Sequence, residues 1–353
     1  MHLCQMSNPI EKAGAIIPIG WPEMTARGSE KIWDHLRKLG IIKNINLLVG
    51  HAGMIIVEHD NLEYFDFGRY ITPKTMGRAR SSRTDPKLKL STLPKWGDNG
   101  ELINFVEILK ELENNAEATH GEGSIYASVY YEADVNKVLD YAYSIQDLGF
   151  TGYNGIDRKC TNCARFVTRA MMAGLPSNSK EFMKFRFPAT IIAPTPYSNV
   201  LTGASGEGYC IFLNGVATFH NRPKLHGLTQ ILGNLTHAFR KSKATKLPSD
   251  KKAGQLYPPK PRPSSVADNA TYIGGIGEGA WHFLEIVDEE IVQMKRYSAA
   301  GVLEFSADYK VLKSWVLEFA NDQCELVHDT HFAWITLRSK LSGKQLRCLR
   351  LNK

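Results

Sequence analysis

The chain of 353 residues is poor in cysteine and has no long apolar run. Its cysteines are Cys4, Cys160, Cys163, Cys210, Cys324 and Cys348. Cysteines this sparse do not form the dense disulfide framework of small secreted domains. No stretch approaches the roughly 18 apolar residues of a membrane span, and residues 1–15 lack the apolar core of a secretory signal. We therefore expect reduced thiols, no transmembrane segment, and a cytoplasmic location unless another route exports the protein.

Charge of one sign is also not strongly in excess. The 43 Lys and Arg residues exceed the 36 Asp and Glu residues by a formal net charge of +7. No nucleic-acid recognition motif accompanies this charge, so we expect no nucleic-acid partner. The hydrophobic fraction of 43% is typical of a globular protein, and the length suffices for two domains with a well-buried core. The oligomeric state is left open by these totals.

The first half mixes helical and strand patterns. Residues 47–67 contain two apolar runs around a polar turn, which predicts a β-hairpin. Helical spacing of apolar residues predicts helices over 102–112 and 132–148, and aromatic and β-branched residues predict a strand over 124–131. Such a mixture predicts the α+β class with an antiparallel sheet.

Residues 69–95 are rich in lysine, arginine and proline. This composition predicts a long basic loop beside the hairpin. Such a loop is either a solvated surface segment or, where a rigid scaffold positions it, a site for an anionic group of a substrate.

The second half has a different pattern. Residues 244–270 are rich in Lys, Pro and Ser and read as a linker. The glycine-rich run 274–279 lacks the strand–helix frame of a phosphate-binding loop, so we expect a flexible entry into a β-rich segment. Short alternating strands from residue 280 onward predict a small β-rich module. The expected organisation is a first domain over 1–180, a mixed connecting region over 181–243, the linker over 244–270, and the module over 271–353.

Cys163 is the strongest candidate for a chemical role. It follows Asn162, a good helix N-cap, and precedes apolar residues at helical spacing. A cysteine at the start of a helix is close to free backbone N–H groups and to the positive end of the helix dipole, both of which stabilise a thiolate. The alternative is a small buried side chain without chemistry, the usual state of a free cysteine.

His51 supplies the group that such a nucleophile needs. It lies in an apolar run between small residues, Gly50 on one side and Ala52 and Gly53 on the other. A polar ring in an apolar strand needs partners to offset its burial, and a thiol or thiolate can be one of them. The small neighbours leave space for another element or a substrate. We therefore expect His51 to act as general base for Cys163.

These motifs also resemble a known group of enzymes. The order of a Gly-His-x-Gly strand at residues 50–53 and an Asn-Cys-x-x-Phe-Val helix at residues 162–167 is similar to the circularly permuted NlpC-type branch of the papain-like superfamily, and within it to the lecithin–retinol acyltransferase-like group. The resemblance covers residues 15–175. It implies a papain-like domain whose antiparallel sheet packs on the cysteine-bearing helix, with Cys163 as nucleophile and His51 as base.

The resemblance further implies a polar residue that orients the histidine from the next strand. Glu63 is the first choice, because it follows His51 by twelve residues, as the corresponding histidine does in the acyltransferase-like group. Asp66 is the alternative if the spacing is longer. An acid in place of that histidine fits a hydrolase at least as well as an acyltransferase, because a carboxylate fixes the imidazole tautomer and stabilises its charged form.

Three further residues near the cysteine are candidates for substrate binding. They are Tyr153, Asn162 and Arg165. The expected substrate is a peptide, a cell-wall peptide included, or an acylated small molecule. The expected reaction is cleavage of an amide or ester through an acyl-enzyme, without cofactor or metal.

Two other functions fit parts of the sequence. Cys160 and Cys163 form a Cys-x-x-Cys unit, which in a suitable frame performs thiol–disulfide exchange. A zinc site would need a second pair of ligands at closer spacing than any in this chain. A binding or scaffolding protein on the same fold is the remaining alternative, and the reactivity of Cys163 toward thiol reagents separates it from an enzyme.

Overall fold

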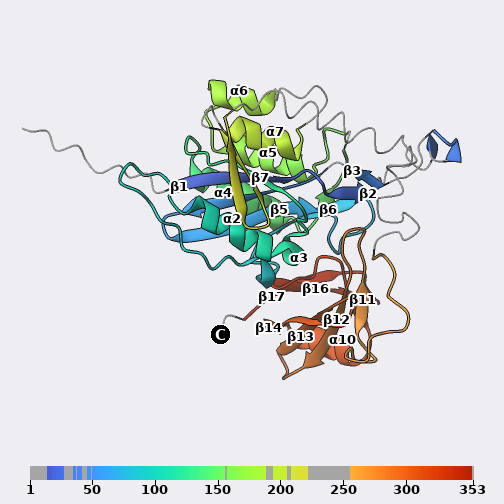
Figure 1. The fold of residues 1–353 in the computed structure, drawn as a ribbon. Helices are drawn as coiled ribbons and strands as arrows, with labels where there is room; N and C mark the ends of the chain where they lie inside the picture. The colour runs from blue at the N-terminus through green and yellow to red at the C-terminus, as the bar shows by residue number, and fades with distance from the viewer. Residues whose placement is uncertain are drawn as a thin grey trace, which may run out of the picture.

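The computed structural model describes residues 14–27, 35–36, 38–41, 46–48, 50–155, 157–187, 194–204, 208–221 and 255–351. Within these ranges the molecule has one large sheet with helices on both faces and a separate β-rich C-terminal region (Figure 1). The α+β class, the antiparallel pairing and the β-rich C-terminal region predicted from the sequence are confirmed. None of the described helices is long and apolar enough to cross a membrane.

The large sheet has eight strands in the order β10-β9-β7-β1-β4-β5-β6-β8. The strands are β1 (Gly14–Trp21), β4 (His51–Glu58), β5 (Asn61–Gly68), β6 (Met76–Arg80), β7 (Ile125–Ala127), β8 (Thr151–Gly152), β9 (Tyr209–Leu213) and β10 (Val216–His220). Strands β9 and β10 come from the predicted connecting region 181–243, and they extend the sheet of the first domain. A separate two-stranded sheet pairs β2 (Thr25–Arg27) with β3 (Asn46–Leu48).

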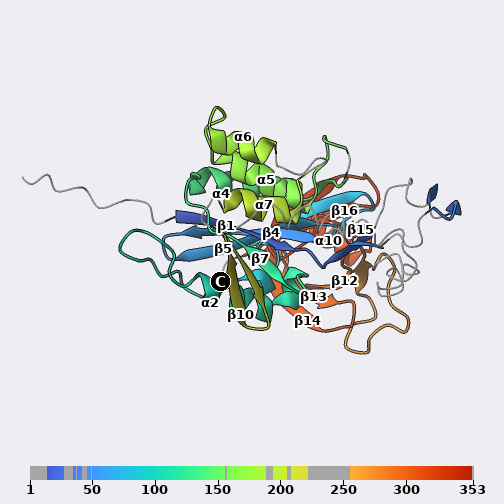
Figure 2. The same ribbon diagram turned by 45° about the horizontal axis from the view of Figure 1, so that its top comes forward.

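Helices cover the two faces of the large sheet. One face carries α4 (Val135–Asp147), α5 (Cys163–Ala173), α6 (Lys180–Arg186) and α7 (Pro196–Gly203), and the other carries α2 (Phe105–Asn114), as Figure 2 shows. The short α3 (Ala116–Thr119) follows α2, and its Ala118 packs against the same cluster as α2. Because both faces are covered, neighbouring residues of a strand are buried in different clusters. Ile17 packs against α2, and Ile16 belongs to the cluster of α5.

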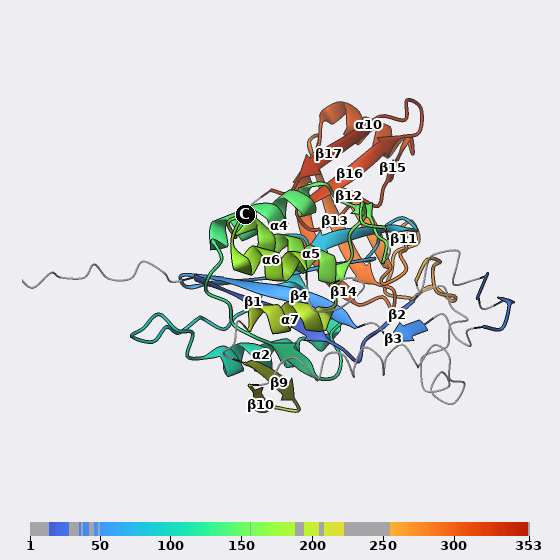
Figure 3. The same cartoon turned by 90° about the horizontal axis from the view of Figure 1, so that it is seen from above.

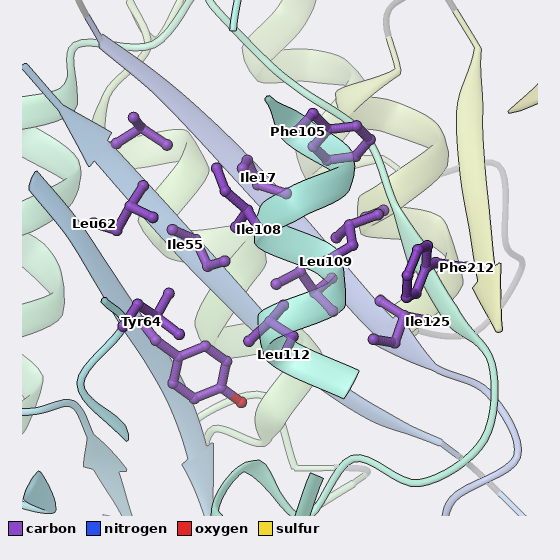
Figure 4. Close-up of a cluster of buried hydrophobic side chains, with 14 of the residues drawn as sticks. Ile17, Ile55, Leu62, Tyr64, Phe105, Ile108, Leu109, Leu112, Ile125 and Phe212 are labelled. Atoms are coloured by element: carbon purple, nitrogen blue, oxygen red, sulfur yellow. The ribbon is translucent and has the colours of Figure 1, made fainter. Parts of the chain in front are cut away.

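The cluster under α2 fixes the positions of β1, β4 and β5. Ile108 and Leu109 of the helix pack against Ile17, Ile55 and neighbouring side chains of the strands (Figure 4). These side chains are fully buried, and burial of each contributes about 1.5–3 kcal/mol to stability. The strands that carry the candidate site residues are therefore held by a well-packed core.

The segment 69–95, predicted to be one long basic loop, is interrupted by regular structure. It contains β6 and a 3-10 helix, η1 (Pro86–Leu88), and two of its arginines, Arg78 and Arg80, are buried in ion pairs rather than solvated. Arg78 binds Asp85 through two hydrogen bonds of 2.7 Å, and Arg80 binds Asp66. Two of the four arginines in this segment are thus internal partners of carboxylates, whereas Arg83 pairs with Asp147 at the surface.

The C-terminal module contains two small antiparallel sheets. The first comprises β11 (Thr271–Ile273), β12 (Ala280–Ile286), β13 (Ile291–Ser298) and β14 (Leu303–Lys310), and the second comprises β15 (Cys324–Leu326), β16 (Trp334–Ser339) and β17 (Gln345–Leu349). Helix α10 (Lys313–Ala320) connects them, and the two sheets share one hydrophobic cluster. Figure 3 shows the module on the opposite side of the large sheet from β9 and β10. The predicted linker 244–270 lies partly outside the described residues.

Candidate active site

Cys163 is the first residue of α5. The side chain of Asn162, at the N-cap, accepts a hydrogen bond of 2.8 Å from the backbone N–H of Arg165. This cap leaves the first N–H groups of the helix close to the cysteine, where they and the helix dipole favour an anion. The residue is 9% exposed. The start of α5 therefore places the thiol in a mostly buried, electropositive position.

His51 begins β4 and is fixed on several sides. Its Nε2 lies 3.2 Å from Oδ2 of Asp66 and 3.1 Å from the hydroxyl oxygen of Tyr70. The ring of Trp21 stacks on the imidazole, with centroids 5.6 Å apart and planes 19° from parallel. Because Nε2 faces Asp66 and Tyr70, Nδ1 is the nitrogen left for the hydrogen bond between His51 and Cys163.

The two groups shift each other's titration. Burial alone would raise the pKa of the Cys163 thiol, but the hydrogen bond and charge of His51, with backbone N–H groups of Ala52 and Ala164, lower it overall. Burial alone would lower the pKa of His51, but the hydrogen bonds and charges of Asp66 and Cys163 raise it to about 9. Each group therefore favours the charged form of the other, a thiolate beside an imidazolium.

Asp66 is the carboxylate that bonds His51. Burial would raise its pKa, but Arg80 and His51 hold it well below the usual range. Arg80 donates from Nε to Oδ1 at 3.0 Å and from Nη2 to Oδ2 at 2.6 Å, and the carboxylate is fully buried. A bidentate arginine fixes both the charge and the orientation of a carboxylate. Asp66 thus stays ionised and keeps the His51 ring in one orientation.

The register of the hairpin explains why Asp66, and not Glu63, meets His51. In the β4–β5 pair Gly53 lies opposite Asp66, and Ile56 lies opposite Glu63. Gly53 is two residues from His51 and on the same face of the strand, whereas Ile56 is five residues away and on the other face. Glu63 accepts hydrogen bonds from Ser82 instead. The structure brings the predicted alternative to His51 and places the first choice elsewhere.

The other candidate residues support the loop before the cysteine. The Arg165 guanidinium, 7% exposed, donates to the backbone carbonyls of Asn154, Gly155, Asp157 and Cys160. The Tyr153 ring stacks on Phe67, with Arg69 above it at 4.9 Å. Asn162 acts as the helix cap. A contact of Tyr153, Asn162 or Arg165 with substrate stays a prediction.

Tyr70 and Arg80 were missed by the sequence analysis. Both lie in the segment read as a basic loop, and neither has a motif of its own. One signal was present for Arg80: Asp66 lies between Phe65 and Phe67 in its strand, and a carboxylate buried there needs a cation. The residues that the next strand places opposite Asp66 were therefore the candidates for this cation. Nothing comparable in the sequence pointed to Tyr70.

The two other functions considered for the cysteines are thiol–disulfide exchange and zinc binding. Cys160 and Cys163 are both free thiols, and Cys160 lies 3.9 Å from a carboxylate oxygen of Asp157. Cys163 is instead coupled to His51. Within the described ranges no group of three or more His, Cys, Asp or Glu side chains could hold a metal ion.

A cavity of about 420 Å³ lies next to this site, between the first domain and the C-terminal module. Arg80 and His120 line it from the first domain, and Glu278 and Arg296 line it from the module. The His120 ring stacks on Tyr70 with centroids 5.1 Å apart. Of the described residues that line the cavity, none is Cys163 or His51. It therefore lies behind the Tyr70–Arg80 side of the site and not over the thiol.

Comparisons with known proteins match two separate parts of the chain. Residues 16–180 match the model of a family described as type VI secretion system effector TseH-like, and residues 270–347 match the DUF6695 C-terminal domain. A solved structure titled as the type VI secretion system effector TseH aligns over 58% of this chain and 97% of its own, at 16% identity and a TM-score of 0.41. No curated protein matches the chain.

Proposed function

We propose that the chain is a cysteine hydrolase on a permuted NlpC-type, papain-like domain, cleaving an amide or ester bond through an acyl-enzyme on Cys163. The observation that carries the proposal is the coupled set Cys163–His51–Asp66, in which a lowered thiol pKa meets a raised histidine pKa. The match of residues 16–180 to the TseH-like effector family supports it. Perturbed titration of a nucleophile and a base in contact is typical of functional sites.

Each residue has a role in the proposed reaction. The Cys163 thiolate attacks the carbonyl carbon, and the N–H groups at the start of α5 stabilise the oxyanion that forms. The His51 imidazolium then gives its proton to the leaving amine or alcohol, which leaves an acyl-thioester on Cys163. Neutral His51 next removes a proton from water, the hydroxide releases the acid, and the thiolate is restored. Asp66 keeps the imidazole oriented and stabilises its charge in both steps.

The chemistry of the site and the family match support a substrate class for the proposed reaction. Peptides and acylated small molecules both offer the carbonyl that the thiolate attacks. Cell-wall peptides require the protein to leave the cell that makes it, and the matched family is described as effectors of type VI secretion. The proposal therefore includes export of the protein by such a system. The proposed place of action is then outside the cytoplasm, and the leading candidate for the substrate is a cell-wall peptide.

Alkylation of Cys163 by iodoacetamide at a series of pH values tests the proposal directly. The thiol should react well below the ordinary thiol pKa of about 8.5, because His51 stabilises the thiolate, and His51→Ala should remove this advantage. Peptide mapping assigns the labelled site, with the partly exposed Cys160 as an internal reference. Ordinary or slow reaction of Cys163 in both proteins would favour the binding-protein alternative, and a reversible Cys160–Cys163 disulfide would favour the redox alternative.

Hydrolysis should fall at alkaline pH while alkylation does not. The proposed leaving-group step needs the His51 proton, and the pKa of His51 is about 9. Above that pH the imidazole becomes neutral, so kcat/KM should drop by about tenfold per pH unit. The thiolate persists there, so the alkylation rate should stay on its plateau. Hydrolysis that continues to rise well above pH 9 would contradict the role of His51 as the acid.

A further inference from the structure

Tyr70 is part of the His51–Asp66 arrangement, although it lies outside the large sheet. Its hydroxyl donates to Oδ2 of Asp66 at 3.0 Å, and its oxygen lies 3.1 Å from Nε2 of His51, from which it can accept. Arg80 covers the ring, with Cζ at 3.5 Å from the centroid. The side chain is 5% exposed, so its place depends on the packing around it.

The backbone next to Tyr70 adopts a conformation that its own residues do not favour. The next residue, Ile71, has φ of +43°, a left-handed conformation that a β-branched residue strongly disfavours. Such conformations persist only where the surrounding structure imposes them. The Ile71 side chain is 1% exposed and is buried in a cluster with Ile273 and Ala280, both from the C-terminal module. Ile71 therefore anchors the Tyr70 segment in the module.

The glycine-rich run 274–279 contacts the same segment through its backbone. Gly277 N–H donates to the Arg69 carbonyl at 2.9 Å, and Ile71 N–H donates to the Glu278 carbonyl at 3.2 Å, which forms a parallel bridge between Tyr70 and Glu278. A Cβ on Gly275 would lie 2.7 Å from the Ile71 nitrogen. The run is glycine-rich at this point because a side chain would separate the two backbones.

Buried ion pairs make a second connection to Tyr70. Arg296 of β13, 3% exposed, donates to Asp85 at 3.2 Å and also pairs with Glu278 and Glu304. Asp85 accepts both Arg78 hydrogen bonds, and Nε of Arg78 donates to the Tyr70 carbonyl at 3.1 Å. The module thus reaches Tyr70 by three routes, of which one is apolar, one is through the backbone, and one is ionic.

We propose that the C-terminal module is a working part of the active site, because it fixes Tyr70 as a positioning residue for His51 and Asp66. This inference rests on the proposed function. The Tyr70 hydroxyl oxygen shares the single N–H at Nε2 of His51 with Asp66, and its own proton goes to the Asp66 carboxylate, which it steadies. Without the module the strained turn at Ile71 would relax, the hydroxyl would leave, and the imidazolium would lose part of its stabilisation.

Two substitutions and their combination test this inference in the full chain. Tyr70→Phe keeps the ring over which Arg80 lies but removes the hydroxyl. It should lower kcat about tenfold or more, leave KM nearly unchanged, and move the Cys163 alkylation midpoint to higher pH. Gly275→Ala acts only from the module side, and it should produce the same shift and the same loss in kcat. Because both act on one group, the double variant should be no worse than Tyr70→Phe alone.

Gly343→Ala is the matched control within the module. Gly343 has φ of +70° in a turn with open space around it, so alanine there strains the module without touching the Tyr70 segment. It should leave activity and the alkylation midpoint at wild-type values. A wild-type midpoint in Gly275→Ala, or losses that multiply in the double variant, would overturn the inference while leaving the proposed function standing. A wild-type Cys163 that itself titrates like an ordinary thiol would overturn both.

Discussion

Replacement of Cys163 by alanine should abolish hydrolysis. The proposed reaction forms its covalent intermediate on this sulfur, so no other group in the site can substitute for it. Loss of a covalent nucleophile reduces kcat by about 10⁴-fold to 10⁶-fold in enzymes of this kind of mechanism. The fold should survive, because alanine fills the first position of α5 and Asn162 still caps it. Steady-state rates on a peptide or ester substrate, with circular dichroism to verify folding, measure both.

Cys160→Ala is the control for this substitution. Cys160 neighbours the site in sequence but lies next to Asp157 rather than His51. Hydrolysis should stay within about twofold of wild type, because a surface change of this kind alters little. Activity that survives in Cys163→Ala would refute the acyl-enzyme mechanism. Loss in both variants would instead point to a joint role of the two thiols, as the redox alternative requires.

Replacement of Asp66 by asparagine should have the second largest effect. The amide is close in shape, but it cannot stabilise the imidazolium, and it can hold the ring in the wrong tautomer. A comparable change in the serine-protease triad lowers kcat by about 10⁴-fold, and a loss of about 10³-fold to 10⁴-fold is expected here. The alkylation midpoint of Cys163 should rise at the same time, because a weaker imidazolium stabilises the thiolate less.

Stability must be measured beside activity, because Asp66→Asn also leaves Arg80 without its anionic partner. Breaking a buried ion pair costs about 3–5 kcal/mol, which thermal unfolding will reveal. Glu63→Gln, on the same strand, is the matched control. Its carboxylate bonds Ser82 and not His51, so activity should stay within about twofold of wild type. A larger loss in Glu63→Gln than in Asp66→Asn would restore Glu63 as the orienting residue.

The residues that the sequence made recognisable are those with local signals. Asn162 and Cys163 were recognisable as the start of a helix, and His51 as a polar interruption of an apolar strand. The sequence alone could not decide whether Glu63 or Asp66 contacts His51, because that depends on the register of the two strands. The two residues lie three apart, so a strand places them on opposite faces, and only the register of the hairpin decides which one faces the histidine.

The roles of Arg80, Tyr70 and the glycine-rich run depend on contacts between segments, and none of these residues has a motif of its own. Arg80 meets Asp66 through the pairing of β5 with β6, across a turn whose length hides the partnership. The run 274–279 lies about 200 residues from Tyr70 in the chain. Its glycines indicated conformational freedom, whereas the structure uses them for close approach. Contacts between distant segments leave no periodic trace in a sequence.

The tight turn between β4 and β5 limits how this chain can evolve. Glu58 pairs with Asn61, so only two residues connect the strands. This short turn fixes the register of all the residue pairs from Glu58 and Asn61 to Gly53 and Asp66. Deleting one residue from either strand would shift the register by one and turn the Asp66 side chain to the opposite face. Deleting one residue from each strand beside the turn would preserve the alignment. Descendants that keep the activity should therefore change the length of this hairpin in matched pairs, while the strand ends nearer the cysteine stay fixed.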